Sequence, residues 1–514
     1  MRSSLAALVA PALLSSFAAA QEPCLVQTGG AIGKQATWSI TEGTPGDFWF
    51  LLFAVTEAPT PAFGANLLIP IDLFQFSIDV GAFGFLDGNG AGGFSATVPN
   101  SPSFVGEVFR AQAALGFLPS DQTNLTRLPI SAPQTFRPTF AAPSGLASLA
   151  GGVVLPGDKG ALEFVGGSGL VSTTFDPRLE EFTDGVLPFA ASSLTTSTRL
   201  ADGRVLFAGG LDLLTGAPTN QAFVFDPSNG TSLSVTMVNA RLGHSATLLN
   251  NGKVLLAGGL ATIGLDLSNP ATLLDPATLL GLANDIQATT ELFDPLTNTF
   301  AAAANMPEKR VLHTATLRQN GNVLLAGGIS VIPFINVPTV SSTANDYNPN
   351  TNAFPFFPAF MGTARAGHEA VATPDGRVLM IGGLTADFTT FLTSGNIADI
   401  TVSSVATIER FTANFIGGSF ANVGTLQEGR ALCSAILLPN NHVLVAGGFV
   451  LDLSDPLAPV IGNSNAADVY RGVNDVIAVG DMAAARILPI MAKLDTGAVL
   501  VAGGLAGGAE IYQP

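Results

Sequence analysis

The chain has few charged residues and very few cysteines, tryptophans and tyrosines. Only 11% of its 514 residues are Asp, Glu, Lys or Arg, and it contains 2 Cys, 2 Trp and 3 Tyr. Two cysteines are too few for a disulfide framework. The net charge of −17 argues against nucleic acid or an anionic membrane surface as a partner. Outside the extreme N-terminus, Gly, Pro or polar residues interrupt every apolar run, so we expect no transmembrane segment.

Residues 1–20 have the pattern of a secretory signal peptide. Arg2 supplies the positive charge, residues 5–14 supply the short apolar core, and three alanines ending at Ala20 supply a cleavage site. We therefore expect cleavage near Ala20 and secretion to the extracellular space, the cell surface or the periplasm. Export would permit a disulfide between Cys24 and Cys433, but a free, buried Cys433 is the simpler expectation.

Seven glycine doublets, each at the end of a short apolar run, dominate the rest of the chain. They are Gly166-Gly167, Gly209-Gly210, Gly258-Gly259, Gly327-Gly328, Gly382-Gly383, Gly447-Gly448 and Gly503-Gly504. Their recurrence is the signature of a repeat architecture. Six positions before each doublet stands Gly or Asn, often after Asn or Asp, as in Asn251-Gly252. Such pairs adopt the positive φ angles of a tight hairpin turn, which predicts two antiparallel strands per unit. We expect the doublet to end the second strand where a side chain would obstruct a neighbour.

An aromatic residue marks a third strand in every unit, and a second aromatic marks an outer, fourth strand in several. The third-strand residues are Phe175, Phe225, Phe293, Tyr347, Phe411, Tyr470 and Tyr512. The outer-strand residues are Phe182, Phe300, Phe354 and Phe415. Four antiparallel strands repeated seven times predict an all-β fold, a seven-bladed β-propeller.

This combination of a glycine doublet and two following aromatics resembles the kelch motif over about residues 134–514. The resemblance implies a kelch-type propeller similar to the central domain of galactose oxidase. The chain departs from the usual kelch pattern because Phe stands where Trp is common in the outer strand.

The seventh unit ends at Pro514 after three strands, and residues 134–138 look like a fourth strand without a blade. We expect this segment to complete the seventh blade, because an open ring would leave a strand edge unpaired. The predicted organisation is a signal peptide (1–20), a small all-β, sandwich-like domain (21–131) and the propeller (132–514). In the small domain, Asp87-Gly88-Asn89-Gly90 lacks the acidic residues that should follow in a calcium loop, and it is interpreted as a hairpin turn.

Five arginines stand 17 residues before their doublets and are the candidate binding residues. They are Arg241, Arg310, Arg365, Arg430 and Arg486. Three residues further on come His244, His313, His368, Cys433 and Pro489, and four residues earlier come Met237, Met306, Met361, Leu426 and Met482. A ring of arginines at one mouth of the central channel would suit a carboxylate or sugar-acid ligand. The alternative is structural, because a residue repeated in blade after blade serves packing and hydrogen bonding. One histidine per blade is too dispersed for zinc, so we expect no metal site and no cofactor.

Galactose oxidase-like enzymes hold copper with tyrosines and histidines, and one tyrosine is cross-linked to cysteine. Here Tyr347, Tyr470 and Tyr512 all occupy the repeated third-strand position. We therefore expect no copper-radical chemistry.

A sugar mutarotase or epimerase remains an alternative, because that chemistry needs only an acid/base pair and an arginine. The candidate acids are Glu163, Glu308 and Glu428, although none is matched to an arginine in a way that breaks the repeat.

The connections between second and third strands differ most between units. They are long at 260–290, 384–405 and 449–467, and Asp275-Pro276 could start a short helix in the first of these. Long loops of this kind are commonly functional, and strand alternation places them on the same face as the arginines. The preferred hypothesis is a secreted, monomeric, non-catalytic binding protein with no catalytic residues. Its ligand is an unidentified protein or glycan, bound on this face.

Overall fold

The computed structural model describes residues 180–514 except 213, 263–280, 282, 333, 335, 388–389, 391–393, 395–398, 415–416, 454–459 and 505–507. Between residues 24 and 177 it describes the strands and a few adjoining residues. The predicted signal peptide lies outside the described residues. The chain divides into two compact units, residues 1–130 and 131–514.

The first unit contains two antiparallel sheets and a short hairpin. One sheet has the order β1-β2-β7, and the other has the order β10-β8-β3-β6 with β9 beside β8. The strands are β1 (Cys24–Thr28), β2 (Gln35–Thr41), β3 (Phe48–Ala54), β4 (Thr60–Ala62), β5 (Ala65–Leu67), β6 (Phe83–Phe85), β7 (Gly92–Thr97), β8 (Val108–Leu115), β9 (Asp121–Gln122) and β10 (Thr126–Pro129). Alternate residues of β2, β3 and β8 form one core that includes both tryptophans, Trp38 and Trp49.

The Asp87 segment forms a turn between β6 and β7, but these strands belong to different sheets, so it is not the predicted hairpin turn. The Asp87 carboxylate accepts hydrogen bonds from the backbone N–H groups of Asn89 (2.8 Å) and Ala91 (2.9 Å). These two bonds lower the pKa of the Asp87 carboxyl. The carboxylate therefore stabilises the turn itself.

The second unit repeats one sheet pattern, four antiparallel strands that we call inner, second, third and outer. Seven sheets of this pattern lie among the described residues. The inner strands are β12 (Val153–Pro156), β16 (Thr196–Arg199), β22 (Ser245–Leu248), β26 (Thr314–Leu317), β32 (Glu369–Ala372), β38 (Ser434–Leu437) and β44 (Ile490–Lys493). The second strands are β13 (Leu162–Val165), β17 (Val205–Ala208), β23 (Val254–Ala257), β27 (Val323–Ala326), β33 (Val378–Ile381), β39 (Val443–Ala446) and β45 (Val499–Ala502).

The third strands carry the repeated aromatic residue, and the outer strands lie at the rim. The third strands are β14 (Gly169–Asp176), β20 (Gln221–Asp226), β24 (Thr290–Asp294), β30 (Thr343–Tyr347), β36 (Thr407–Thr412), β42 (Ala467–Gly472) and β46 (Ala509–Gln513). The outer strands are β15 (Glu181–Ala191), β21 (Thr231–Thr236), β25 (Thr299–Ala302), β31 (Ala359–Phe360), β37 (Ser419–Thr425), β43 (Asp475–Ala478) and β11 (Thr135–Pro138).

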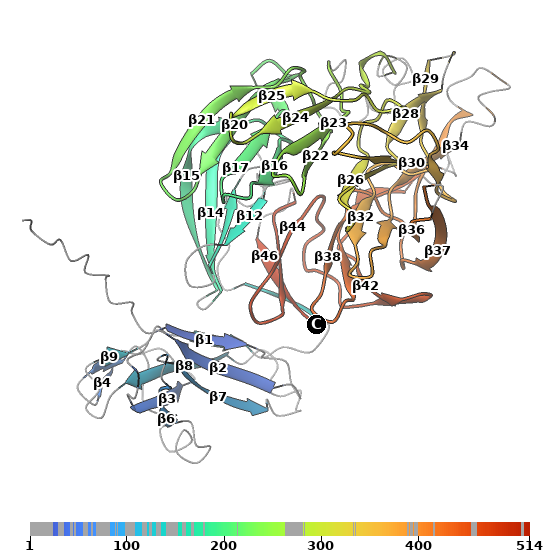
Figure 1. The fold of residues 1–514 in the computed structure, drawn as a ribbon. Helices are drawn as coiled ribbons and strands as arrows, with labels where there is room; N and C mark the ends of the chain where they lie inside the picture. The colour runs from blue at the N-terminus through green and yellow to red at the C-terminus, as the bar shows by residue number, and fades with distance from the viewer. Residues whose placement is uncertain are drawn as a thin grey trace, which may run out of the picture. The chain divides into compact units, whose positions relative to one another are not determined.

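The sheets succeed one another around a centre as the blades of a β-propeller (Figure 1). Each inner strand contacts the next in chain order, and β44 contacts β12. The last sheet combines both ends of the unit, because β11 pairs with β46 in the register Phe136 to Tyr512. Their rings pack with centroids 5.2 Å apart.

In the six described doublets, from Gly209-Gly210 to Gly503-Gly504, both glycines have positive φ angles and follow the second strand, which confirms their predicted role; Gly166-Gly167 lie outside the described residues. In the third blade, Gly258 has φ +65° and Gly259 has φ +95°. A Cβ on Gly258 would lie 2.3 Å from the carbonyl oxygen of Arg310 in the next blade. The backbone therefore requires glycine for its conformation and for the close approach of its neighbour.

The hairpin turns differ from the prediction in one respect. In Asn251-Gly252 only Gly252 has a positive φ, +81°. Its N–H donates to the carbonyl of Leu249 (2.9 Å), so a three-residue turn with a left-handed glycine replaces the expected two-residue turn. The Asn251 carboxamide oxygen accepts from the N–H of Lys253 (3.1 Å). Asn and Asp thus recur here because they bond to the backbone two residues on.

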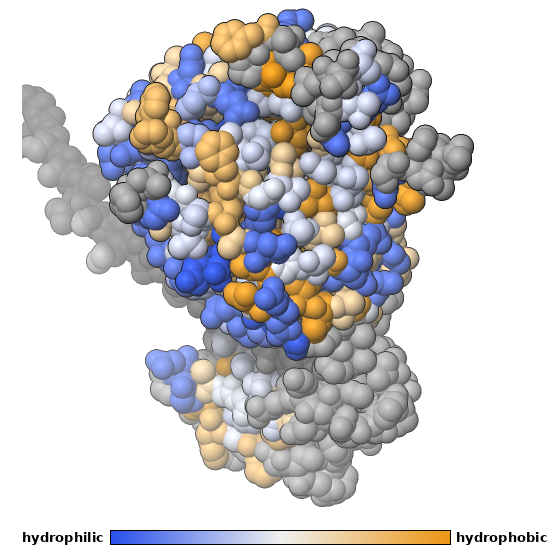
Figure 2. Space-filling view, turned by 90° about the vertical axis from the view of Figure 1, so that its right-hand side faces the viewer, coloured by the Kyte–Doolittle hydropathy of each residue, from blue (hydrophilic) through white to orange (hydrophobic). Residues whose placement is uncertain are grey.

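Pairs of aromatic rings link third and outer strands. Phe175 packs with Phe182, Phe293 with Phe300, and Phe411 with Phe420. Tyr347 packs with Phe354, but Phe354 lies between β30 and β31 and not in the outer strand as predicted. The predicted Phe415 lies outside the described residues, and Phe420 takes the outer position in that blade. At the surface, polar and apolar side chains are interspersed over one side of the molecule (Figure 2), which is ordinary for a chain with 47% apolar residues.

The long connections build additional strands beyond the second strands. The fourth blade carries the hairpin β28 (Ile329–Ile332) and β29 (Val337–Val340). The fifth and sixth blades jointly form one sheet from β34 (Leu384–Asp387), β35 (Thr401–Ser404), β40 (Phe449–Asp452) and β41 (Val460–Asn463). β29 contacts β34, and Figure 1 shows these segments side by side. The second blade has the short pair β18 (Leu211–Asp212) and β19 (Ala217–Pro218), and in the third blade Gly281 and residues 283–285 are helical.

Candidate functional site

A residue with a left-handed backbone stands two positions before the inner strand in six blades. These belt residues are Leu194, Gly243, Leu312, Gly367, Leu432 and Leu488. Backbone hydrogen bonds join five of them from blade to blade: Leu312 N–H to Gly243 (3.0 Å), Gly367 to Leu312 (2.8 Å), Leu432 to Gly367 (2.7 Å) and Leu488 to Leu432 (2.8 Å). The left-handed backbone conformation costs a leucine about 1–2 kcal/mol of conformational free energy, so the belt contains strained backbone that its hydrogen bonds hold in place.

The belt and the residues after it line a cavity of about 160 Å³ at the channel mouth. Its lining residues come from the third to seventh blades. They are Gly243, His244, Leu312, His313, Gly367, His368, Glu369, Leu432, Cys433 and Leu488. The described lining residues include no lysine or arginine.

In three blades a buried histidine follows the belt residue and contacts the preceding blade. Nε2 of each histidine lies 2.9 Å from a hydroxyl oxygen at the start of the neighbouring inner strand. The pairs are His244 with Thr196, His313 with Ser245, and His368 with Thr314. Burial, and then the nearby arginines, lower the pKa of His244 and His313 to about 3. These histidines are therefore neutral near pH 7 and connect adjacent blades.

The contact changes between the fifth and sixth blades. Cys433 takes the place of the histidine, and Glu369 takes the place of the hydroxyl residue. Glu369 is the first residue of β32, is partly buried and lines the cavity. The repeat is therefore broken by a carboxyl group that faces neutral neighbours.

Burial makes Glu369 the cavity residue that titrates near neutral pH. It raises the pKa of the Glu369 carboxyl to about 7 and that of the Cys433 thiol to about 12. The pKa of His368 is well below its ordinary value, again chiefly because of burial. Among the described lining residues, only Glu369 changes its charge between pH 6 and 8.

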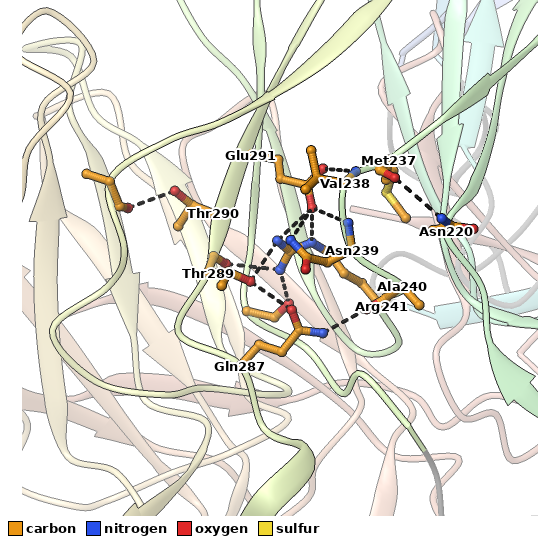
Figure 3. Close-up of polar contacts among 12 residues, drawn as sticks. Asn220, Met237, Val238, Asn239, Ala240, Arg241, Gln287, Thr289, Thr290 and Glu291 are labelled. Carbon is orange, nitrogen blue, oxygen red and sulfur yellow. Dashed lines mark hydrogen bonds and ion pairs between the residues drawn. The ribbon is translucent and has the colours of Figure 1, made fainter.

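The five arginines are buried within the blades, with exposed fractions of 0–1%. Figure 3 shows the arrangement around Arg241 in the third blade. Its Nη2 donates to Oε1 of Glu291 (2.9 Å), and its Nη1 donates to the carbonyls of Gly258 (2.6 Å) and Thr289 (3.0 Å). Glu291 also accepts from the N–H groups of Val238 (2.7 Å) and Asn239 (2.9 Å). We call this unit of arginine and acid an arginine clip.

The clip recurs with an acid two residues before the third-strand aromatic. The ion pairs are Arg365–Glu409 (2.6 Å), Arg430–Asp468 (2.6 Å) and Arg486–Glu510 (3.2 Å). The arginines therefore fasten the doublet strand to the third strand, and none of them lines the cavity. Their geometry favours the structural alternative over a ring of ligand-binding guanidinium groups.

The second and fourth blades differ from the others at the clip positions. In the second blade Ser192 and Phe223 replace the arginine and the acid together. In the fourth blade Asn345 stands at the acid position, and Glu308 pairs with Arg310 instead (2.9 Å). The candidate acid Glu308 is thus engaged in an ion pair, and Glu428 does not line the cavity.

Three of the connections between second and third strands begin beside this mouth. Isolated bridges place Val311 beside Ile329, Ala366 beside Leu384, and Ala431 beside Phe449. Each connection therefore starts next to the residue preceding the belt, so the connections and the cavity share one face, as strand alternation predicted. We call it the insertion face.

Sequence reasoning missed Glu369, although its signal was present. The residue after the histidine is Ser245 in the third blade, Thr314 in the fourth and Glu369 in the fifth. An aligned comparison of that single column would have exposed the break. The clip acids were equally readable as a column two residues before the third-strand aromatic.

No family model and no curated protein matches this chain in sequence. Among solved structures, YjhT shares 16% identity over 66% of this chain and 98% of its own, with a TM-score of 0.47. A fungal alcohol oxidase of the AA5 family, in complex with copper, shares 15% identity over 74% of this chain and 75% of its own, with a TM-score of 0.51. The likeness to the alcohol oxidase, together with the four-stranded sheets, shows the fold. The chain is an all-β propeller.

The residues of this propeller do not fit a copper centre built from tyrosines and histidines. Tyr347, Tyr470 and Tyr512 are buried in third strands, away from the lining of the channel-mouth cavity. The described residues contain no group of three or more His, Cys, Asp or Glu that could hold a metal ion. Cys433 is a free thiol. Across the described residues, no helix has the length and apolar character needed to span a bilayer.

Proposed function

We propose that this propeller is a non-catalytic binding protein whose partner is a protein bearing a basic side chain. The partner docks on the insertion face and places a lysine or arginine in the channel-mouth cavity beside Glu369. The observation that carries this proposal is the broken repeat. At the start of β32, the carboxyl group of Glu369 stands where the neighbouring blades have a hydroxyl group. It lines a cavity whose described lining residues include no cation.

Size and charge support a single basic side chain as the occupant. A cavity of about 150 Å³ holds one benzene molecule, so the roughly 160 Å³ found here accommodates one long side chain. The ammonium or guanidinium group would supply the cation that Glu369 lacks, while Leu312, Leu432 and Leu488 offer methyl groups to the aliphatic stem. The net charge of −17 also favours a basic partner.

Secretion is part of the same proposal and rests on the sequence of residues 1–20 alone. The mature chain would begin at Gln21 and act as a monomer outside the cytoplasm or at the cell surface.

The proposal is tested by selecting peptides from a random display library with the mature chain. We expect enrichment of peptides that contain lysine or arginine, and we expect Glu369→Gln to abolish it. Asp481→Asn is the matched control, because it removes one exposed acid that does not line the cavity. Selected peptides without basic residues, or the same peptides with Glu369→Gln, would contradict the proposal.

A sugar mutarotase or epimerase is the second candidate. It is favoured by Glu369, because a carboxyl group with a pKa near 7 suits general acid–base catalysis at neutral pH. The buried clips oppose it, since no arginine is free at the cavity to hold a sugar acid. Exchange of sugar anomers followed by NMR would support the enzyme if the rate changed around pH 7 and vanished in Glu369→Gln.

A further inference from the structure

A second break in the repeat lies in the first blade, far along the chain from Glu369. The residue three positions before the doublet is leucine in six blades and is almost fully buried, with an exposed fraction of 0–1%. These leucines are Leu206, Leu255, Leu324, Leu379, Leu444 and Leu500. In the first blade the position is occupied by Glu163, which is only partly buried. A carboxyl group therefore stands where every other blade has a core methyl group.

The polar replacement continues across the sheet. Glu163 of β13 pairs in register with Thr174 of β14, and Thr174 pairs with Thr183 of β15. Cross-strand partners share one face of a sheet, and Ser172, two residues from Thr174, lies on that face as well. One face of the first blade thus presents a carboxyl group and three hydroxyl groups.

These groups line a cavity of about 330 Å³ between the first and second blades. The second blade contributes the end of β20 and the following turn, including Phe225 and Pro227. β15 contacts β21 of that blade, and Figure 1 shows the two strands next to each other. Leu187 and Pro188 add apolar surface to the lining.

The cavity holds hydrogen-bond acceptors without a cation. Asp184 borders the cavity, but it pairs with Thr173 on the opposite face of the sheet, and its carboxylate accepts a hydrogen bond from the Thr173 hydroxyl there (3.1 Å), so Glu163 supplies the carboxyl group of this face. No lysine or arginine is among the described residues that line it. Burial raises the pKa of the Glu163 carboxyl, which shows that the group is poorly solvated in its place. A polar group in this position is stabilised when a ligand donates hydrogen bonds to it.

We propose that the cavity between the first and second blades binds a neutral monosaccharide unit, whose hydroxyl groups donate to Glu163. The volume lies at the lower end of the range for small-molecule sites and suits one sugar ring. Ser172, Thr174 and Thr183 can each donate or accept, which matches the hydroxyl pattern of a sugar. Pro188 and Pro227 offer apolar surface to the ring CH groups. The Glu163 carboxylate would repel an acidic sugar.

This site is independent of the channel mouth, so the two proposals stand or fall separately. The probes are glucose, galactose, mannose and glucuronate at millimolar concentration, observed by saturation-transfer NMR with the mature chain. We expect at least one neutral hexose to bind and glucuronate not to bind.

Two variants of Glu163 separate binding from folding. Glu163→Gln should lower the affinity for the hexose at least tenfold. Glu163→Leu restores the residue found in the other six blades, so it should abolish binding while it raises the thermal unfolding midpoint. Glu181→Gln, an acid on β15 outside the lining, is the matched control and should bind like the parent chain.

The outcomes are decisive in both directions. Binding of a neutral hexose that Glu163→Leu removes, in a protein that unfolds at a higher temperature, supports the site. Absence of binding by every hexose, binding that survives Glu163→Leu, or equal binding of glucuronate would overturn it.

Discussion

The arginine clip of the third blade makes a prediction about buried charge. Glu291 has a fully buried side chain and accepts hydrogen bonds from Arg241 and from the backbone of Val238 and Asn239. Replacing Glu291 by Gln keeps its shape but leaves the guanidinium charge of Arg241 without a counterion. Removing one partner of a buried ion pair costs about 3–5 kcal/mol. We expect Glu291→Gln to lower the free energy of unfolding of the propeller by that amount.

The second blade provides the design of the double variant. Because Ser192 and Phe223 occupy the clip positions there, a blade folds with neither charge. Arg241→Ser combined with Glu291→Phe removes the desolvated arginine together with its acid. We therefore expect the double variant to be destabilised less than the sum of the two single variants, by about 2 kcal/mol or more.

Urea unfolding, followed by tryptophan fluorescence and by far-UV circular dichroism, measures the loss of stability and shows which unit it affects. Both tryptophans belong to the first unit, so their fluorescence reports that unit, while far-UV circular dichroism is dominated by the larger propeller. The variants should shift the dichroism transition and leave the fluorescence transition unchanged. The reasoning would be refuted if the losses of unfolding free energy added up in the double variant. It would also be refuted if Glu291→Gln lowered that free energy by less than about 1 kcal/mol.

Three further predictions concern the doublet, the closing strand and the channel mouth. Gly258→Ala should cost about 3 kcal/mol, because its Cβ would meet the Arg310 carbonyl at 2.3 Å and the φ of +65° disfavours alanine; urea unfolding measures it. Arg137→Pro removes a backbone donor from β11, so the chain should aggregate more readily through the exposed edge of β46, as size-exclusion chromatography would show. Burial raises the pKa of Glu369 from 4.5 to about 7, so the stability it contributes is present below pH 4.5 and is lost as the pH rises through 7. Glu369→Thr should therefore be more stable than the parent chain by about 3 kcal/mol at pH 8 but not at pH 4.5, in urea unfolding at the two pH values.

Binding of a basic peptide should follow the same titration. The Glu369 carboxylate forms as the pH rises through about 7, whereas a lysine ammonium stays charged to about pH 10. His244, His313 and Cys433 do not change charge in this interval. The apparent affinity should therefore rise about tenfold between pH 6 and 8 in calorimetric titrations. An affinity independent of pH would place the peptide elsewhere.

Because the unit recurs, the structure of one blade could be predicted from the sequence. Strand order, the role of the doublets and the shared face of long connections and inner-strand starts followed from columns that recur, because each blade solves the same packing problem. The turn type did not follow, since Asn-Gly suits both a two-residue turn and a type I turn with a left-handed glycine. The outer aromatic of the fifth blade was misplaced because the spacing between its third and outer strands differs from the other blades.

The candidate site was harder to predict because function lies in departures from the repeat. The arginines were noticed as repeated charges, yet the acids of Arg241, Arg365, Arg430 and Arg486 lie 24 to 50 residues away in sequence and are found only through the strand pairing. Glu369 and Glu163 each occupy a column filled by other residue types, but only the structure shows that both columns border cavities. Burial then decides which carboxyl group titrates near neutral pH.

The central claim is that a basic partner of this propeller binds on the insertion face. Amide hydrogen exchange of the mature chain, with and without a selected basic peptide, tests it most directly. We predict protection of β28, β29, β34, β35 and the segments 310–313 and 366–369. Protection confined to the opposite hairpin turns, such as residues 249–253 and 318–322, would contradict the account.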